Sequence, residues 1–279
     1  MKRRFLGVTG FVCGIFLLAA AVVSAHDFWL VPTLFRVKPG AKVAVALNTG
    51  DTFPASEGAV KPERLESVSL IHPGGTTALT TFRTEGKSTI VDATMPKAAG
   101  GAIVEVVIKP IATKQSRASF DEFVKHEGLD QIAARLAGEK ERRLEERRTY
   151  AKYAKTLLRV GSGKGAVDLY KKPLNHRLEI IPYADPYSLT PGERFPVRLL
   201  FDGKPLVNAR LVVGSANAAT ATQSEMPGVR TDSQGCARLQ LDKTGGAHYI
   251  HALYMIEAAD KTNVEWESFW ATLTFEARR

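Results

Sequence analysis

Apolar and polar residues alternate in short runs between Phe28 and Pro110. Runs such as KVAVALNTG, RLESVSLIH and AIVEVVIKP carry apolar side chains at every second position, which is the period of a β-strand. Pro-Gly, Gly-Asp and Gly-Gly pairs separate the runs and are typical of turns. This half of the chain is therefore predicted to contain roughly six or seven β-strands, arranged as a sandwich rather than as alternating strands and helices.

The pattern changes between Ser119 and Val160, where apolar residues recur at the spacing of a helix. This spacing predicts two or three helices within a helical insertion at 113–160. The residues that carry it are Phe120, Phe123, Val124, Leu129, Ile132, Leu136, Tyr150, Tyr153, Ala154, Leu157 and Leu158. The glycine-rich stretch that follows predicts a linker at 161–176. Because it lacks the glycine spacing of a phosphate-binding loop, no nucleotide site is expected there.

Strand-like alternation returns in a C-terminal region at 177–279. In the run 194–201 the apolar residues fall on one side, while two arginines and a proline fall on the other. Asp202-Gly203 follows that run and predicts a tight hairpin. The fold class is therefore predicted to be mainly β, with one sandwich at 26–112 and a second at 177–279, on either side of the helical insertion.

The first 25 residues have the layout of a secretory signal peptide. Three basic residues come first, an apolar stretch follows, and small residues precede a predicted cut after Ala25. The mature chain would then begin at His26, in the periplasm. A cut after Ala21 and an uncleaved membrane anchor are the alternatives, although no stop-transfer pattern follows. No membrane span is expected in the mature chain.

Charge and cysteine content narrow the class of protein. Loss of the three basic residues of the signal lowers the formal net charge from +9 to +6 at pH 7. Charges of both signs are interleaved between Lys114 and Arg159, which indicates a solvated surface and not a nucleic-acid interface. Cys236 is the only cysteine left after processing, so neither a disulfide framework nor a multi-cysteine zinc site is expected. No sequence motif favours an enzyme.

His26 carries the most specific chemistry of the predicted mature chain. A histidine at the first position offers a free α-amine and a ring nitrogen, which can close on one metal ion as a chelate. Their unperturbed pKa values are about 8 and about 6.5, so both groups lose their protons readily near neutral pH. With a further imidazole, such a nitrogen-rich site favours Cu(II), with Ni(II) next. The sequence therefore predicts a transition-metal site at His26.

A second imidazole must come from one of the remaining histidines. His72 adjoins a turn, His126 lies on a charged predicted helix, and His176 has no informative context. His248 and His251 are three apart in one predicted strand and therefore point to opposite faces, so at most one of them is a ligand. For either, a buried histidine bonded to the backbone is the alternative.

Several segments resemble the domain-of-unknown-function 4198 family over nearly the whole predicted mature chain. They include the predicted mature start HDFWLVP at 26–32, the Phe53-Pro54 pair, LEIIP at 178–182, FDGKP at 201–205 and WESFWATL at 266–273. The resemblance implies an immunoglobulin-like or transthyretin-like β-sandwich and a NikM-like periplasmic role associated with nickel or cobalt uptake. It assigns His26 and His251 as matching positions and brings no catalytic residues.

The leading functional hypothesis is a non-enzymatic periplasmic protein that binds a nickel, cobalt or copper ion through His26 and His251 and presents it to a membrane metal transporter. One alternative is a copper-dependent oxidoreductase that uses the same N-terminal chelate. Another is a metal-free module that binds a carbohydrate or a protein through exposed aromatic residues. Because β-sandwiches host unrelated functions, the fold cannot choose among them.

Overall fold

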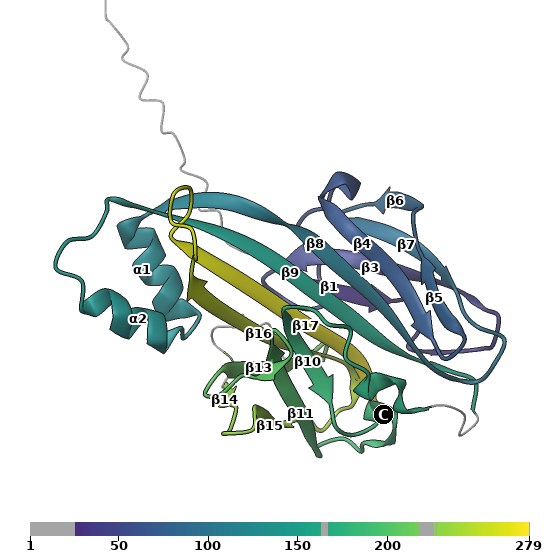
Figure 1. The fold of residues 1–279 in the computed structure, drawn as a ribbon. Coiled ribbons are helices and arrows are strands. Elements are labelled where there is room, and N and C mark those ends of the chain that lie inside the picture. Colours follow the sequence, from purple (N-terminus) through teal and green to yellow (C-terminus); the bar gives the residue numbers. More distant parts are fainter. Residues whose placement is uncertain (1–25, 163–166, 218–225, 227, 279) are drawn as a thin grey trace, which may run out of the picture.

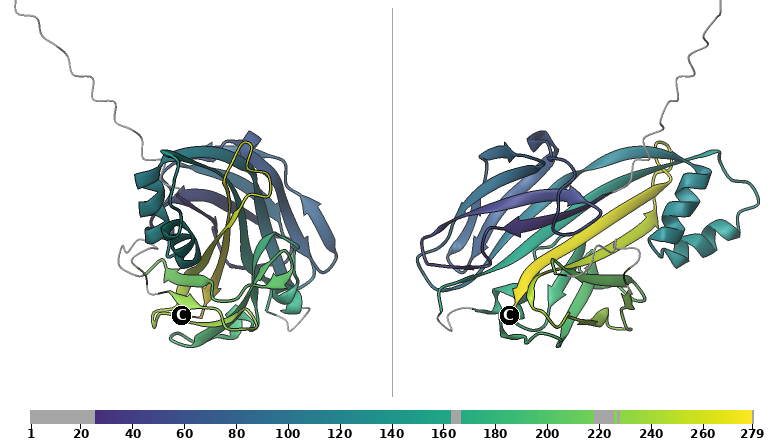
Figure 2. Two further views of the ribbon diagram at one scale, coloured as in Figure 1. Left: turned by 60° about the vertical axis from the view of Figure 1, so that its left-hand side comes forward. Right: turned by 180° about the vertical axis from the view of Figure 1, so that it is seen from behind.

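A computed structural model describes residues 26–162, 167–217, 226 and 228–278. The predicted signal peptide and part of the predicted linker lie outside these residues. Figure 1 shows an elongated molecule in which one long, twisted sheet runs from end to end, with other elements packed on both of its faces. The same layering is visible from two further directions in Figure 2.

The long sheet has nine strands. Their order is β14 (Val229–Arg230), β13 (Arg210–Ser215), β16 (Gly246–Glu257), β17 (Trp266–Ala277), β9 (Glu145–Val160), β8 (Gly100–Ser116), β4 (Leu65–His72) and β5 (Gly75–Ala78), with β2 (Arg36–Val37) pairing to β9. Neighbours are antiparallel except for β17 and β2, which both run parallel to β9. Strands from both predicted sandwiches therefore meet in one sheet.

One face of the long sheet is covered by two separate layers. The first is a four-stranded sheet in the order β1 (Asp27–Pro32), β3 (Lys42–Gly50), β7 (Ser88–Thr94) and β6 (Phe82–Glu85). The second is a helix pair, α1 (Arg117–His126) and α2 (Asp130–Ala137). Trp270 packs against the helices, while Thr272, two residues further along β17, donates a hydrogen bond to a carbonyl of β1. Both layers thus lie on the same face, because alternate residues of a strand point the same way.

The opposite face is covered by a small C-terminal sheet of β10 (Leu178–Pro182), β11 (Arg194–Phe201), β12 (Lys204–Pro205) and β15 (Cys236–Gln240). Phe195 and Leu199 of β11 are fully buried against Leu273 and Phe275 of β17. The hairpin predicted at Asp202-Gly203 is present, with positive φ at both residues, as a tight primed turn requires. Short 3-10 turns occur at Pro62–Arg64, Val167–Lys171 and Pro186–Ser188.

The fold is mainly β and of the sandwich type, as predicted, and the two sandwiches share the long sheet. Residues 113–116 still belong to β8, but helices α1 and α2 lie in the first half of the predicted helical insertion at 113–160. Its second half was predicted wrongly, because 145–160 forms the strand β9. This strand is covered on both faces, so its apolar residues do not alternate cleanly with polar ones, and their spacing imitates that of a helix.

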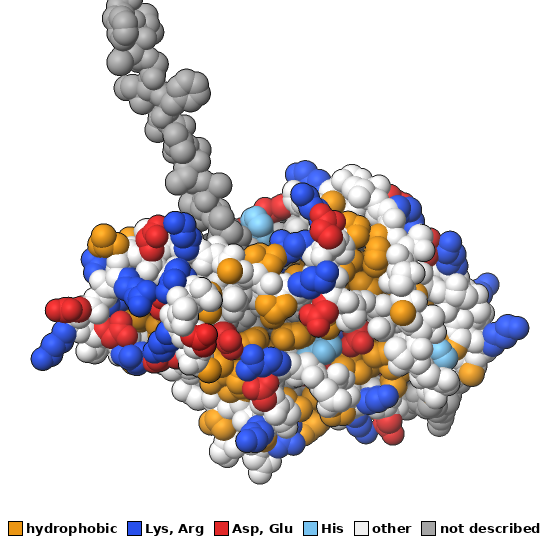
Figure 3. All heavy atoms as spheres, turned by 45° about the horizontal axis from the view of Figure 1, so that its top comes forward, with side chains coloured by type: hydrophobic (Ala, Val, Ile, Leu, Met, Phe, Trp, Pro, Cys, Tyr) orange, Lys and Arg blue, Asp and Glu red, His pale blue; other side chains and the backbone are white. Residues whose placement is uncertain are grey.

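The surface carries charges of both signs. On the face drawn in Figure 3, Lys and Arg side chains are interspersed with Asp and Glu, and apolar groups lie between them. No extended patch of positive charge is visible on that face.

Candidate metal centre

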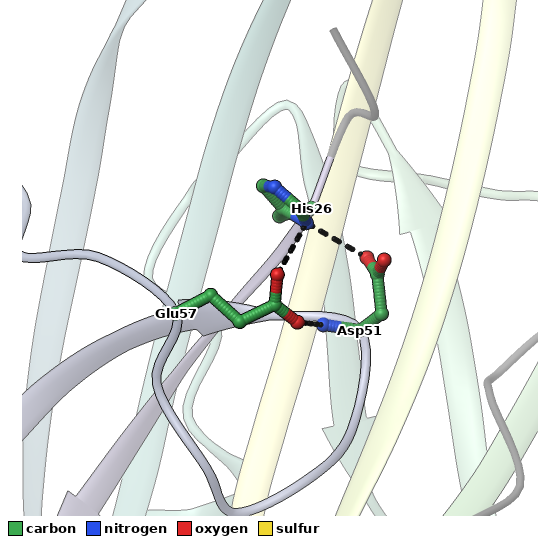
Figure 4. Close-up of side chains that lie close together, drawn as sticks. All are labelled: His26, Asp51 and Glu57. Atoms are coloured by element: carbon green, nitrogen blue, oxygen red, sulfur yellow. Dashed lines mark hydrogen bonds and ion pairs between the residues drawn. The ribbon is translucent and has the colours of Figure 1, made fainter. Parts of the chain in front are cut away.

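The side chains of His26, Asp51 and Glu57 converge at the start of β1 (Figure 4). His26 Nδ1 lies 2.9 Å from an Asp51 carboxylate oxygen and 3.6 Å from a Glu57 carboxylate oxygen. The three ligand atoms all lie within 4.8 Å of one another. Each side chain is between 37% and 46% exposed, so an ion can reach the cluster from solvent.

Strand pairing brings these residues together. β1 and β3 are antiparallel, and Asp27 pairs with Gly50, so Asp51 at the end of β3 comes to lie beside His26. The chain then folds back, and the Glu57 amide donates to the Thr49 carbonyl at 2.7 Å. Glu57 Oε1, the carboxylate oxygen that does not face His26, accepts a 2.9 Å hydrogen bond from the Asp51 amide. This bond fixes the orientation of the carboxylate.

The backbone at His26 is anchored to the long sheet. The Lys152 ammonium of β9 donates a hydrogen bond to the His26 carbonyl. Further along β1, Thr272 and Thr274 of β17 donate to the carbonyls of Phe28 and Leu30 at 2.5 and 2.7 Å. The first residues of β1 are therefore held by two central strands of the sheet, and the position of His26 follows from theirs.

His251, the second predicted ligand, lies beside Asp27 rather than in the His26 cluster. Its Nε2 is 3.2 Å from an Asp27 carboxylate oxygen, and both side chains are almost completely buried. As predicted, the two histidines of β16 point to opposite faces, because Tyr249 and His251 face β1 while His248 stacks on Phe275. His251 therefore contacts Asp27, the residue after His26 in sequence, and does not contact His26 itself.

Burial controls the ionisation of this inner pair. It lowers the pKa of His251 to about 3, with help from the positive charges of Arg210 and Lys152, so the ring is neutral near pH 7. Burial, with a smaller contribution from Glu127, also raises the pKa of Asp27 well above its usual range, although Lys152 opposes this shift. Burial in turn lowers the pKa of Lys152 to about 8.

We expect His251→Gln to reduce the loss of unfolding free energy that occurs as the pH falls. The unfolded chain binds a proton at this histidine below about pH 6.5 and the folded chain does not, so folded wild-type protein loses stability as the pH falls from 6.5 towards 3. The variant should reduce that slope by up to about 1.4 kcal/mol per pH unit. Asp27 acts in the opposite direction, but both proteins retain it. Urea titrations at several pH values measure the difference, and equal slopes would contradict the assignment.

The remaining histidines have separate environments. His248 Nδ1 lies 2.8 Å from the Gly246 carbonyl oxygen, which is the backbone-bonded arrangement considered for a buried histidine. His176 lies 2.9 Å from a Glu105 oxygen and stacks on Tyr153. His72 accepts a hydrogen bond from the Gly74 amide, and His126 is exposed at the end of α1. None of the four joins the three-residue cluster found among the described residues.

Three residues of the site were missed by sequence reasoning: Asp51, Glu57 and Lys152. The sequence places Asp51 directly after a predicted strand that ends in Thr49-Gly50. Only the register between β1 and β3, however, shows that Asp51 faces His26. Glu57 reaches the site through a loop, which has no periodic signal. Lys152 was assigned to a helix, and that misassignment hid its direction.

Comparison with known proteins identifies the family of this chain. The family described as Domain of unknown function (DUF4198) matches residues 23–255. The chain belongs to this DUF4198 family. The family name assigns no activity, and among curated proteins none matches this chain. The match confirms the resemblance predicted from the mature start and the later segments, but it does not test the NikM-like role.

Solved structures are similar only at a low level. The D0-D1 domain of Intimin is 12% identical, with 89% of this chain and 97% of that chain covered and a TM-score of 0.22. The Escherichia coli adhesin FdeC is 12% identical over 91% of this chain and 64% of that chain, with a TM-score of 0.24. Trypsin-activated alpha-2-macroglobulin from Escherichia coli is 11% identical over 90% of this chain and 15% of that chain, with a TM-score of 0.23. These scores are too low to carry an argument about fold or function.

The helices of the described residues are short. None of them is long and apolar enough to cross a membrane.

Proposed function

We propose that this protein is a periplasmic accessory protein that binds a divalent nickel, cobalt or copper ion at an N-terminal histidine chelate, for uptake or handling by a membrane metal transporter. The observation that carries the proposal is the convergence of His26 Nδ1 with the carboxylates of Asp51 and Glu57. Cleavage after Ala25 would add the α-amine of His26 to this set.

The donor set suits a tetragonal transition-metal ion. The α-amine and Nδ1 of one histidine can close a six-membered chelate ring, and Nδ1 is the ring atom that faces the two carboxylates. Two nitrogens and two carboxylate oxygens make a mixed set that favours Cu(II) or Ni(II), with Cu(II) bound most tightly at a given site and Co(II) more weakly than Ni(II). The carboxylates also supply the negative charge that a divalent cation requires.

The first test is a metal titration of mature protein whose start at His26 has been verified by intact mass. Wild-type protein is titrated calorimetrically with Cu(II), Ni(II) and Co(II), beside Asp51→Asn and Glu57→Gln. Each substitution keeps the shape of the side chain and removes its charge, and each should weaken binding by at least about 10-fold, since even outer-shell partners contribute about 10–100-fold.

His72→Gln is the matched control, because His72 lies at a separate turn. Its affinity should equal that of wild-type protein. Unchanged affinity in both carboxylate variants, or no binding by the wild type, would rule out the cluster as a metal centre and favour a metal-free binding module.

Lys152→Met should weaken metal binding although Lys152 is not a ligand. The ammonium holds the His26 carbonyl and so acts as a positioning residue for the chelate. We expect about a 10-fold loss of affinity and a lower thermal stability, because the substitution leaves the His26 carbonyl and the buried Asp27 carboxylate without this cation. The electron paramagnetic resonance spectrum of bound Cu(II) should broaden as the geometry loosens. If Lys152→Met keeps both the Cu(II) affinity and the sharp spectrum of wild-type protein, Lys152 has no positioning role.

A further inference from the structure

A cavity of about 300 Å³ lies between the loop that joins α2 to β9 and the hairpin that joins β16 to β17. These elements form the end of the molecule that carries the helix pair (Figure 1). The volume is at the lower end of the range for small-molecule sites, which is roughly 300–1,000 Å³. Trp266 and Glu146 are buried residues of the lining, whereas Lys140, Glu141 and Arg143 are exposed. The cavity therefore has room for a small molecule and is open to solvent.

The charges that line this cavity compensate one another. Five glutamates and four basic residues line it together with Trp266. Glu146 pairs with Arg142 at 3.1 Å, and Glu265 pairs with Arg143 at 2.8 Å. The other ion pairs of lining glutamates include Glu139–Arg135 and Glu257–Lys261. A ligand with a net charge would have to break one of these pairs or enter without a counter-charge, and both are costly. The lining therefore favours a neutral ligand.

The lining offers both donors and acceptors of hydrogen bonds. Arg142 Nε is buried and has no hydrogen-bond partner among the described residues, since the Glu139 carboxylate is 4.0 Å away. Arg143 donates from Nη1 to Glu265, and within the described chain its other N–H groups have no partner. Each ionised carboxylate can accept about four hydrogen bonds, so the glutamates are acceptors as well. A ligand that uses these groups must both donate and accept.

We propose that this cavity binds a small neutral saccharide of one or two sugar rings. Each sugar hydroxyl donates and accepts hydrogen bonds and carries no charge, which matches a lining of mixed donors and acceptors whose charges are already paired. Carboxylate and guanidinium groups are forked, so one such group can bond two neighbouring hydroxyls and fix the orientation of the ring. The cavity shares no residue with the His26 cluster, so the proposal is independent of metal binding.

The test follows the indole N–H signals of metal-free, nitrogen-15-labelled mature protein by nuclear magnetic resonance. Trp266 Nε1 donates to Glu146 at 3.0 Å, so its signal reports on the cavity, while Trp29 and Trp270 are not part of the lining. The spectrum of Trp266→Phe assigns the signal. Glucose, galactose and trehalose are the neutral probes, and at least one of them should shift the Trp266 signal saturably while the other two indole signals move less. Glucuronate and glucosamine add one charged group to a sugar ring and should bind several-fold more weakly than the best neutral probe.

Arg143→Met removes lining donors from a side chain that is 62% exposed, and Arg147 still pairs with Glu265 in this variant, so the fold is retained. It should weaken saccharide binding several-fold. Lys114→Met is the matched control, because Lys114 is 69% exposed, pairs with a glutamate of β9 and does not line the cavity. It should bind as wild-type protein does. The proposal is overturned if no neutral probe shifts the Trp266 signal, if a charged sugar binds as tightly as the best neutral probe, or if Arg143→Met keeps wild-type affinity.

Discussion

A mature chain with one additional glycine before His26 is expected to bind Cu(II) or Ni(II) more than about 100-fold more weakly than the chain that begins at His26, since loss of a direct ligand exceeds the 10–100-fold cost of an outer-shell change. The extension converts the α-amine into an amide, which is a poor ligand near neutral pH, and it breaks the chelate ring. Asp51, Glu57 and the imidazole are untouched. Competition calorimetry against a chelator of known affinity measures the change.

A glycine added after Arg279 is the control, because it lengthens the chain by the same amount at the other end. That form should bind metal as the wild type does. Equal affinity in all three forms would show that the amine is not a ligand. The His26 ring and the two carboxylates would then have to bind metal alone, and the prediction of an N-terminal chelate would be lost.

Lys155→Met is expected to lower the free energy of unfolding by about 3–5 kcal/mol, which is the cost of leaving one partner of a buried ion pair alone. Lys155 and Glu179 are 3% and 2% exposed and lie 2.8 Å apart. Glu179 also accepts hydrogen bonds from the amides of Leu174 and Asn175, so the pair ties β9 to the segment before β10. Urea denaturation measures the loss.

The double variant Lys155→Met, Glu179→Leu should recover part of this loss, because no buried charge remains. Recovery is incomplete, since the two amides lose their acceptor. Lys171→Met is the matched control, because the Lys171–Asp168 pair is exposed and should contribute little to stability. If Lys155→Met costs no more than Lys171→Met, the buried pair does not stabilise the fold.

The two buried lysines of β9 show why the sequence misled at this strand. Lys152 and Lys155 are three apart and point to opposite faces, and each face is covered by a different layer. A central strand that is covered on both faces over most of its length has no continuous exposed polar side, so alternation, which predicted the strands at 42–50 and 194–201, gives no signal there. Helix prediction succeeded at 117–137, where one face of each helix is exposed.

The candidate site was predictable only in part. His26 was found because the signal peptide pattern places it at a predicted chain start, which is a local property of the sequence. Its carboxylate partners depend on the register between β1 and β3, and the neighbourhood of Asp27 and His251 depends on contacts across more than 200 residues. Local patterns do not encode such distances, so His251 was chosen from a resemblance and Asp51 was not chosen at all.

Hydrogen bonds between β17 and β1 join the two ends of the described chain. β17 is the last strand of the described chain, yet its threonines hold β1, the first strand. Until residues 266–277 are available, β1 lacks these anchors, and only its pairing with β3 and the Lys152 contact position His26. Under the proposed function, an incomplete chain would bind metal less well, and a protein that crosses a membrane unfolded would acquire its ion only after residues 266–277 have arrived.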